Sequence, residues 1–409
     1  MKQALLFSLI GLLLASQVAS KSADCMSRLA TLNFVDYVLC YDYPVETHIV
    51  TTQDGYKLTL FRIQAKNTKI TSGKPVVLLW HGLLDSADSW VMNEEHIAPG
   101  FILANLGADI WFGNSRGNKY SLDHVSLNHK NSKDYWAFSW MQMSEGDLPA
   151  AFTYISEKTG QKINYVGHSQ GTTQMFASLA NSAGKNSVVT ANLRKFAALG
   201  PVTHMANVKT KLMVLLANTP LLPEIMAEIG KYGIFNAGWV QSEAGRLLCK
   251  YMQWACTMGI QLVADVDAST DNLARLDVFA GHFPSGTSVT DIMHWKQEVQ
   301  QSGRFQKFDY GSSENQKKYG QTTPPLYEAT RITEEVGMFV GTGDMLADTF
   351  DAAKFYGEMV NAPKKEIHYY PIGHLTFLVG KTLPYMDDLI KFLDLPLKAN
   401  RGFLEIMDV

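Results

Sequence analysis

One stretch, residues 163–171, constrains the fold of this chain more than any other. It reads Ile-Asn-Tyr-Val-Gly-His-Ser-Gln-Gly, so a short apolar run passes directly into the pattern Gly167-x-Ser169-x-Gly171, and a helix-compatible segment, 172–180, follows. A buried strand, a tight turn with serine at its apex and a helix make up a nucleophile elbow, in which a side chain in place of either glycine would clash. The pattern predicts that the Ser169 hydroxyl stands clear of a sheet and that the first helix amides face an oxyanion site. The simpler alternative is a glycine-rich turn without chemistry.

The chain begins with the features of a secretory signal peptide over residues 1–20. Lys2 precedes an apolar run at 4–15, and small residues follow up to Ser20. The apolar run is too short to cross a membrane, although a membrane anchor is the alternative. No later stretch reaches about 18 apolar residues without a charge. We therefore expect a mature chain without a transmembrane segment, which enters the secretory pathway and is either extracellular or lysosomal.

Charge and cysteine content limit the possible partners and cofactors. The formal net charge of −3 argues against a nucleic-acid partner. The four cysteines, Cys25, Cys40, Cys249 and Cys256, form two local pairs, and export permits disulfides. The simplest pairing is Cys25–Cys40 with Cys249–Cys256, but the sequence alone leaves the connectivity open. Their spacing does not fit a zinc site, so we expect no metal.

Short apolar runs predict the strands of one mostly parallel central sheet flanked by helices, an α/β fold. These runs are 76–80, 108–112, 163–166, 196–200, 336–340 and 367–370, and a hairpin at 46–63 turns at Asp54-Gly55. The strand rhythm stops at 201–325, which is too long for a loop and predicts an inserted, mainly helical cap or lid subdomain. Apolar residues at 212–229 would form the core of this cap or a mobile lid. The fold core would then comprise 21–200 and 326–409.

Three residues in the order Ser169, Asp344 and His374 predict a catalytic triad. Asp344 is the first acid after the strand at 336–340, and His374 lies in the loop after the strand at 367–370. This order is expected for the α/β-hydrolase fold and not for the other folds that carry a serine triad. To act as a base, His374 must be neutral, so an acidic optimum would require a pKa below the usual value of about 6.5.

Two backbone N–H groups are the candidate oxyanion donors. One belongs to Leu83, which follows His81-Gly82 at the end of the strand at 76–80, and the other belongs to Gln170. We interpret His81 as a support of this loop. The alternative is an ordinary strand-to-helix loop.

Other polar residues have simpler interpretations. Asp348 is expected to cap a helix and Asp351 to be a surface charge. Arg116 either pairs with a buried carboxylate or is solvated. His168 is too close to Ser169 to turn back and serve it. The remaining histidines are expected on the surface or as satisfied core residues: His48, His96, His124, His129, His204, His282, His294 and His368.

Between about residue 37 and about residue 395 the chain resembles the acid lipases, the gastric and lysosomal lipase group. The shared motifs are Tyr43-Pro44-Val45-Glu46, Thr52-Gln53-Asp54-Gly55-Tyr56, His81-Gly82-Leu83-Leu84, Gly113-Asn114-Ser115-Arg116-Gly117-Asn118, Trp136-Ala137-Phe138-Ser139, Asp147-Leu148-Pro149-Ala150, Gly167-His168-Ser169-Gln170-Gly171-Thr172-Thr173, Gly286-Thr287-Ser288, His294-Trp295, Asp344-Met345-Leu346-Ala347-Asp348 and Gly373-His374-Leu375.

The resemblance implies an α/β-hydrolase core with a helical cap and lid. It implies hydrolysis of triacylglycerols or cholesteryl esters at a lipid–water interface, without a cofactor, colipase or metal. By the same resemblance the nucleophile is Ser169, the acid is Asp344 and the base is His374, with oxyanion amides on Leu83 and Gln170.

The chain departs from the family pattern at three points. Cys249 matches one cysteine of the usual cap disulfide, but the position about nine residues earlier is not cysteine, so a Cys249–Cys256 bond or free thiols are both open. The family pattern has an acid at position 376, where this chain has Thr376. The chain contains no Asn-x-Ser/Thr sequon, so we expect no N-linked glycans.

Three other functions fit parts of the same pattern. A carboxylesterase would use this chemistry on short soluble esters, and a thioesterase or peptidase would use it on other acyl groups. A hydrolase-like protein that binds lipid or a partner without turnover commonly lacks a triad member, whereas all three are present here.

Overall fold

The computed structural model describes residues 25–181, 187–219, 233–234, 251, 265–301 and 303–395. The expected signal peptide at 1–20 lies outside these residues. Cys249, Cys256 and residues 220–229 of the apolar stretch also lie outside the described residues. The predictions made for those parts of the chain stay predictions.

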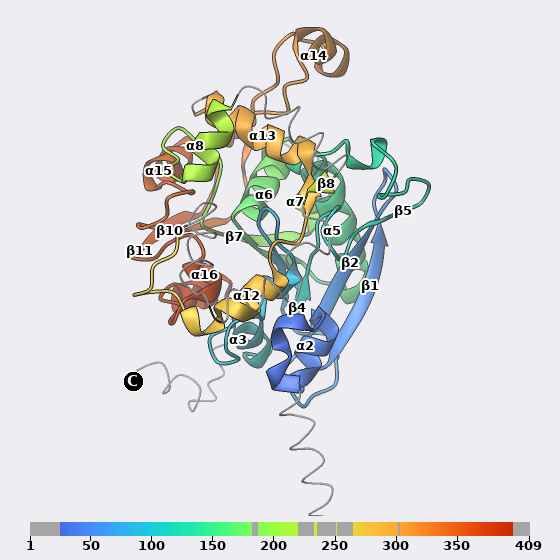
Figure 1. Ribbon diagram of the computed structural model, residues 1–409, viewed down its shortest axis with the longest axis vertical. Coiled ribbons are helices and arrows are strands. Elements are labelled where there is room, and N and C mark those ends of the chain that lie inside the picture. The colour runs from blue at the N-terminus through green and yellow to red at the C-terminus, as the bar shows by residue number, and fades with distance from the viewer. Residues whose placement is uncertain are drawn as a thin grey trace, which may run out of the picture.

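A central β-sheet runs through the molecule, and helices lie on both sides of it (Figure 1). Within the described residues the strand order is β1-β2-β4-β3-β6-β7-β10-β11, and β5 pairs with β2 outside this path. The strands are β1 (Val45–Thr51), β2 (Tyr56–Ile63), β3 (Val76–Trp80), β4 (Asp109–Phe112), β5 (Asp123–His124), β6 (Ile163–His168), β7 (Leu193–Leu199), β10 (Val336–Gly341) and β11 (Lys365–Tyr370). From β4 to β11 in this order every pair is parallel, whereas β2 is antiparallel to β1, β4 and β5. The mostly parallel sheet predicted from the sequence is confirmed.

The apolar runs of the strands follow from burial on both faces of the sheet. All five residues of β3 are buried. Their side chains alternate between two hydrophobic clusters, with Leu78 in one and Val77 and Leu79 in the other. A strand covered on both faces needs apolar residues at every position, which is why β3 reads as a continuous apolar run.

The same two clusters identify the helices that cover each face. One cluster contains Phe152 of α5 and Phe176 of α6, and the other contains Phe34 of α2, Phe101 of α3 and Leu389 of α17. The helices of this part of the fold are α2 (Phe34–Cys40), α3 (Pro99–Asn105), α4 (Trp140–Gln142), α5 (Leu148–Thr159), α6 (Gln170–Asn181), α7 (Val188–Asn192), α15 (Thr349–Glu358), α16 (Thr376–Val379) and α17 (Met386–Phe392). Short 3₁₀ or π turns are η1 (Leu29–Thr31), η2 (Ala87–Trp90), η3 (Asp134–Trp136), η4 (Met143–Asp147), η5 (Leu273–Arg275) and η6 (Ala329–Arg331). The sheet is therefore the middle of three layers.

Between β7 and β10 most of the regular elements in the described residues are helices. These residues form α8 (Lys211–Asn218), α12 (Leu276–His282), α13 (Val289–Gln300) and α14 (Ser312–Tyr319), and the two-residue strands β8 (Gly233–Ile234) and β9 (Thr287–Ser288). These two strands pair antiparallel with each other and not with the central sheet. The helix α14 projects from the body of the molecule at the top of Figure 1. The division of 201–325 into a separate cap subdomain stays a prediction.

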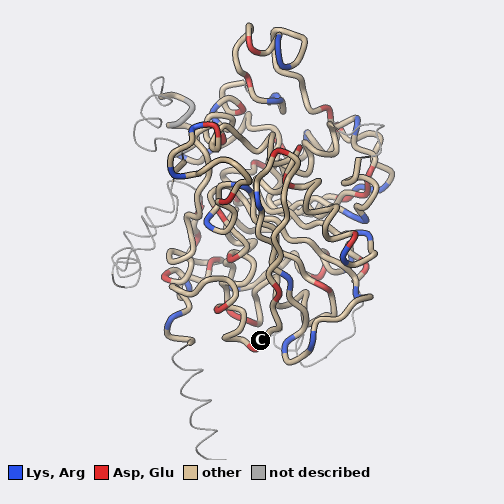
Figure 2. Tube along the Cα trace, turned by 90° about the vertical axis from the view of Figure 1, so that its right-hand side faces the viewer, with Lys and Arg blue, Asp and Glu red and all other residues tan. Residues whose placement is uncertain are grey.

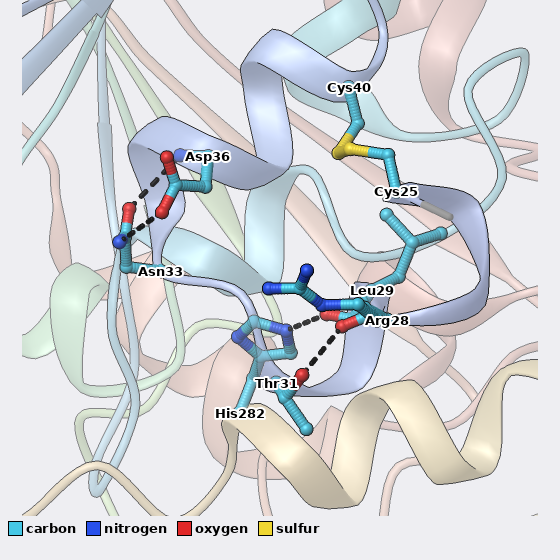
Figure 3. The surroundings of a disulfide bond; sticks show 8 residues. All are labelled: Cys25, Arg28, Leu29, Thr31, Asn33, Asp36, Cys40 and His282. Atoms are coloured by element: carbon cyan, nitrogen blue, oxygen red, sulfur yellow. Dashed lines mark hydrogen bonds between the residues drawn. A yellow bond between two sulfur atoms is a disulfide. The ribbon is translucent and has the colours of Figure 1, made fainter. Parts of the chain in front are cut away.

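A disulfide between Cys25 and Cys40 ties the first described residues to the end of α2 (Figure 3). Beside it, the imidazole of His282 in α12 reaches back to η1, with its Nε2 2.8 Å from the carbonyl oxygen of Leu29 (Figure 3). Its Nδ1 lies 2.8 Å from Asp88 Oδ2. His282 is thus a satisfied core histidine that links the N-terminal segment to the insertion.

Two charged residues clarify the expectations made from sequence. Arg116 is buried, and its Nε donates to Asp147 Oδ1 at 2.6 Å while its other nitrogens bond to Asp54, so it pairs with a buried carboxylate and is not solvated.

Asp348 caps α15, as expected, because its carboxylate accepts from Phe350 N.

The expectation that Asp351 is a surface charge is wrong. Asp351 is only 4% exposed, and its carboxylate accepts from the backbone N–H and the side-chain amide of Asn207, both at 2.8 Å. It lies in the first turn of α15, where a carboxylate is favoured, and that turn faces the segment that follows β7.

Acidic and basic residues are interspersed along the chain (Figure 2), in keeping with a net charge of only −3. Among the described helices, none combines the length and the apolar character required to cross a membrane.

Candidate active site

Ser169 stands at the sharp turn between β6 and α6. Its φ is +53°, in the left-handed region that residues other than glycine seldom adopt. The turn is held because Ser169 N–H donates to the carbonyl of Leu199 in the neighbouring strand β7 at 3.1 Å. Strained backbone of this kind persists only when the surroundings require it, and it is common at functional sites.

The two glycines of the elbow are required by space. A Cβ on Gly171 would lie 2.5 Å from the carbonyl oxygen of Trp80, and one on Gly167 would lie 2.8 Å from the backbone of Gly171. Both obstacles are backbone atoms, which cannot rotate away. The structure therefore bears out the steric argument made from the Gly-x-Ser-x-Gly pattern.

The loop after β3 lies directly against Ser169. A Cβ on Gly82 would be 3.0 Å from the Ser169 Cβ, and Leu84 has a φ of +59°. Leu83 lies between them and lines the same pocket as Ser169. Gln170 is the first residue of α6, so both predicted oxyanion donors lie on backbone that adjoins the serine.

His81 supports this loop, as the sequence predicted. Ser115 N–H donates to His81 Nε2 at 3.0 Å, so the ring proton belongs on Nδ1, which donates to the carbonyl of Gly82 at 2.8 Å. Burial lowers the pKa of His81 to about 4, which keeps the imidazole neutral. The loop after β3 is therefore tied to the loop after β4 through one uncharged ring.

The structure brings Asp344 and His374 together. Asp344 Oδ2 lies 2.7 Å from His374 Nδ1, and Asp344 Oδ1 accepts from the backbone N–H groups of Leu346 at 2.8 Å and Ala347 at 2.7 Å. Burial alone would lower the pKa of His374, but the charge and hydrogen bond of Asp344, together with the charge of Asp265, raise it above the ordinary value. The net direction is opposite to the shift that an acidic optimum would require.

Ser169 and His374 line one pocket. Most of its lining is apolar, and much of it comes from residues between β7 and β10 or from loops at the ends of the strands: Leu83, Leu84, Met205, Met213, Phe279, Phe283, Trp295, Leu346, Leu375 and Leu378. Trp295 of α13 also donates its ring N–H to the side-chain oxygen of Gln170 at 2.6 Å. An apolar pocket with a few polar groups is the usual form of a small-molecule site.

The sequence did not identify two residues that hold His374. One is His168, whose ring Nε2 lies 3.0 Å from the carbonyl oxygen of His374. On the other side, Asp265 Oδ1 accepts from His374 N–H at 2.7 Å. A histidine beside Ser169 was visible in the sequence, but nothing in the sequence linked Asp265, 109 residues before His374, to this loop.

No group of three or more His, Cys, Asp and Glu side chains suited to a metal ion occurs among the residues that the structure describes. The expectation that the protein needs no metal or cofactor stays a prediction.

Comparison with known proteins gives consistent matches. A family described as partial alpha/beta-hydrolase lipase region matches residues 34–94, and one described as alpha/beta hydrolase fold matches residues 75–222. Gastric triacylglycerol lipase from Rattus norvegicus is 36% identical over 362 residues, which cover 87% of this chain and 89% of that protein. Lipase member K from Mus musculus is 34% identical over 374 residues, which cover 89% of this chain and 92% of that protein.

Among solved structures, a soluble variant of monoglyceride lipase from Saccharomyces cerevisiae in complex with a substrate analog has a TM-score of 0.50. It is 14% identical, and the match covers 86% of this chain and 94% of that one. At this identity the likeness concerns the fold alone.

Proposed function

This chain belongs to the family of α/β-hydrolase lipases that includes gastric triacylglycerol lipase and lipase member K, and we propose that it hydrolyses neutral-lipid esters, triacylglycerols or cholesteryl esters, through an acyl-enzyme. Membership makes it a carboxylic ester hydrolase of the lipase type. One observation carries the proposal: Ser169, at a turn with positive φ, and His374, bonded to Asp344, line the same apolar pocket.

In the proposed mechanism His374 is the general base. Its Nδ1–H donates to Asp344, so the free lone pair is on Nε2, which takes the proton from the Ser169 hydroxyl. Ser169 Oγ then attacks the ester carbonyl, and the imidazolium returns its proton to the departing alcohol. Water repeats the sequence on the acyl-enzyme and releases the fatty acid.

The oxyanion of each tetrahedral intermediate would be bound by the backbone N–H groups of Leu83 and Gln170. Each such donor is worth on the order of 3 kcal/mol in other enzymes. The hydrogen bonds of His81 and Trp295 support this assignment, because they hold the loop and the helix start that carry the two amides.

The pocket favours an acyl chain as its occupant. Met213, Phe279 and Trp295, all from the 201–325 insertion, contribute apolar surface beside Ser169. We propose that this insertion caps the acyl site, that residues 1–20 direct export, and that the enzyme acts at a lipid–water interface outside the cell or in the lysosome. Short soluble esters are the principal alternative substrates.

The test is hydrolysis of a long-chain triacylglycerol emulsion, a cholesteryl ester and a short soluble ester from pH 4 to 8. Wild type should hydrolyse at least one of the two lipids, with a rate that rises once the substrate forms an interface. Ser169→Ala should lose on the order of 10⁶-fold in kcat with an unchanged circular dichroism spectrum. Turnover of the soluble ester alone would favour the carboxylesterase, and no turnover by folded wild type would refute the proposal.

A further inference from the structure

The carboxylate of Asp265 bridges the two loops that carry the acid and the base. Its Oδ1 accepts from His374 N–H at 2.7 Å, and its Oδ2 accepts from Met345 N–H at 3.1 Å. Met345 directly follows Asp344. Asp265 thus contacts the backbone of both catalytic loops with one side chain, although it lies 80 and 109 residues before them in the chain.

We propose that Asp265 is a positioning residue for the catalytic histidine: it locks the Asp344 loop to the His374 loop and supplies a second negative charge beside the imidazole. The inference rests on the proposed function, because it concerns the step in which His374 takes the proton from Ser169. At that step the imidazole becomes an imidazolium, and both carboxylates stabilise it.

The chain makes room for this carboxylate at Gly373. A Cβ at position 373 would lie 2.8 Å from Asp265 Oδ2, closer than real Cβ contacts, and 3.1 Å from Oδ1, which is tight. Gly373 is not among the residues with positive φ, so its backbone conformation does not call for glycine, and the nearest obstacle to a side chain there is the Asp265 carboxylate. The carboxylate and the glycine before the catalytic histidine therefore fit each other.

The segment that carries Asp265, residues 265–272, forms hydrogen bonds with several residues that follow His374. Asp271 Oδ1 accepts from the Thr376 hydroxyl at 2.6 Å, and Asn272 N–H donates to the carbonyl of Val379 at 2.7 Å. Further on, Lys381 N–H donates to the carbonyl of Thr270 at 2.8 Å. These bonds hold the segment in place beside the histidine loop, and they therefore fix the position from which Asp265 contacts His374.

The charges around His374 give the proposal an observable consequence. Among the described residues, the titratable groups that act on its imidazole are Asp344, Asp265 and the ring of His168, whose centroid is 4.8 Å away. Burial lowers the pKa of His168 well below the ordinary value, so that ring is neutral. On the adjoining segment Asp271 accepts a hydrogen bond from the Thr376 hydroxyl. Burial raises the pKa of Asp271, and the charge of Lys381 partly offsets this shift.

Removing the Asp265 charge should therefore make His374 easier to deprotonate. Burial and the neighbouring charge of Asp344 raise the pKa of Asp265 to about 6, so near neutral pH it is ionised and can accept from both loops. Its charge raises the pKa of His374. The acidic limb of the pH profile reports this pKa, and a purely structural role of Asp265 would leave that limb where it is.

The experiment compares Asp265→Asn with Asp267→Asn in the full-length enzyme. The amide keeps the size of Asp265 but has one acceptor oxygen and no charge, so one of the two loop contacts is lost. We expect kcat to fall about tenfold, KM to change little, and the acidic limb of kcat/KM to move down by roughly half to one pH unit. Asp267, two residues away and exposed, accepts from Ser269 and not from either catalytic loop, so its variant should match wild type.

The outcomes separate the two proposals. An acidic limb in folded Asp265→Asn that coincides with the wild-type limb would overturn the role of Asp265 while the lipase mechanism stands. Should Asp265→Asn not fold, Asp265→Ser, which is smaller and also neutral, provides the same comparison and the same criterion. If wild type fails to turn over any ester, or Ser169→Ala keeps its activity, the proposed function itself is wrong.

Discussion

Ser169 and His374 line the same pocket, but they are held in different ways. Ser169 lies on a turn that is held by the hydrogen bond from its own N–H to the carbonyl of Leu199. The turn packs so tightly that a side chain at Gly167 or Gly171 would meet backbone atoms. His374 is fixed by hydrogen bonds from side chains far away in the chain. Asp344 holds its ring, Asp265 its N–H group and His168 its carbonyl oxygen.

This difference determines how each half of the site can fail, where the serine half is the turn that carries Ser169 and the histidine half is the loop that carries His374 with its hydrogen-bond partners. The serine half depends on excluded volume, so a single added carbon should disrupt it, whereas charge and pH should affect it little. The histidine half depends on ionised and neutral polar groups, so it should respond in graded steps to protonation and to substitutions that preserve shape.

The largest effect should come from Gly171→Ala. The new Cβ would lie 2.5 Å from the Trp80 carbonyl oxygen and 2.9 Å from that of His81, so β3 or α6 must shift. We expect a loss of roughly 3 kcal/mol or more in the free energy of unfolding, with ester hydrolysis reduced to near background. Denaturant unfolding and hydrolysis of a soluble ester measure the two effects.

Gly357→Ala is the matched control for that change. Gly357 lies within α15, and a Cβ there would meet no heavy atom within 4 Å. Alanine in a helix should raise stability by about 0.5–1 kcal/mol and leave activity unchanged. A Gly171→Ala enzyme with wild-type stability and activity would show that sterics do not set the serine half of the site.

The difference between the halves also explains what the sequence could predict. The elbow, the strands and the order Ser169, Asp344, His374 are encoded in short contiguous patterns, and the parallel sheet follows from the apolar runs. Asp265 could not be found in this way, because its role comes from a contact across 109 residues. Asp351 was misjudged for the same reason, since its partner Asn207 is 144 residues away.

The second prediction concerns pH and tests the histidine half alone. The charge of Asp344 and that of Asp265 raise the pKa of His374, so its protonated form persists to a higher pH than usual. In the proposed mechanism that form cannot accept the Ser169 proton. Activity should therefore be lost as the pH falls. We expect kcat/KM on a soluble ester to drop about tenfold per pH unit below a midpoint above about 6.5. A maximum at pH 4 to 5 would contradict the raised pKa of His374.

The smallest effect should come from the contact between Thr376 and Asp271. The Thr376 hydroxyl donates to Asp271 Oδ1 at 2.6 Å, so Asp271 is the acidic member of this pair. Thr376→Asp alone would set two carboxylates side by side, and Asp271→Thr alone would remove the charged acceptor. Each should cost about 1–2 kcal/mol of stability.

The double variant decides whether the two positions form one unit. Asp271→Thr combined with Thr376→Asp restores one hydroxyl and one carboxylate with their places exchanged. In a thermodynamic cycle of unfolding free energies the double variant should lose at least about 0.5 kcal/mol less than the sum of the single losses. Strict additivity would mean that the contact between Asp271 and Thr376 does not couple the two segments.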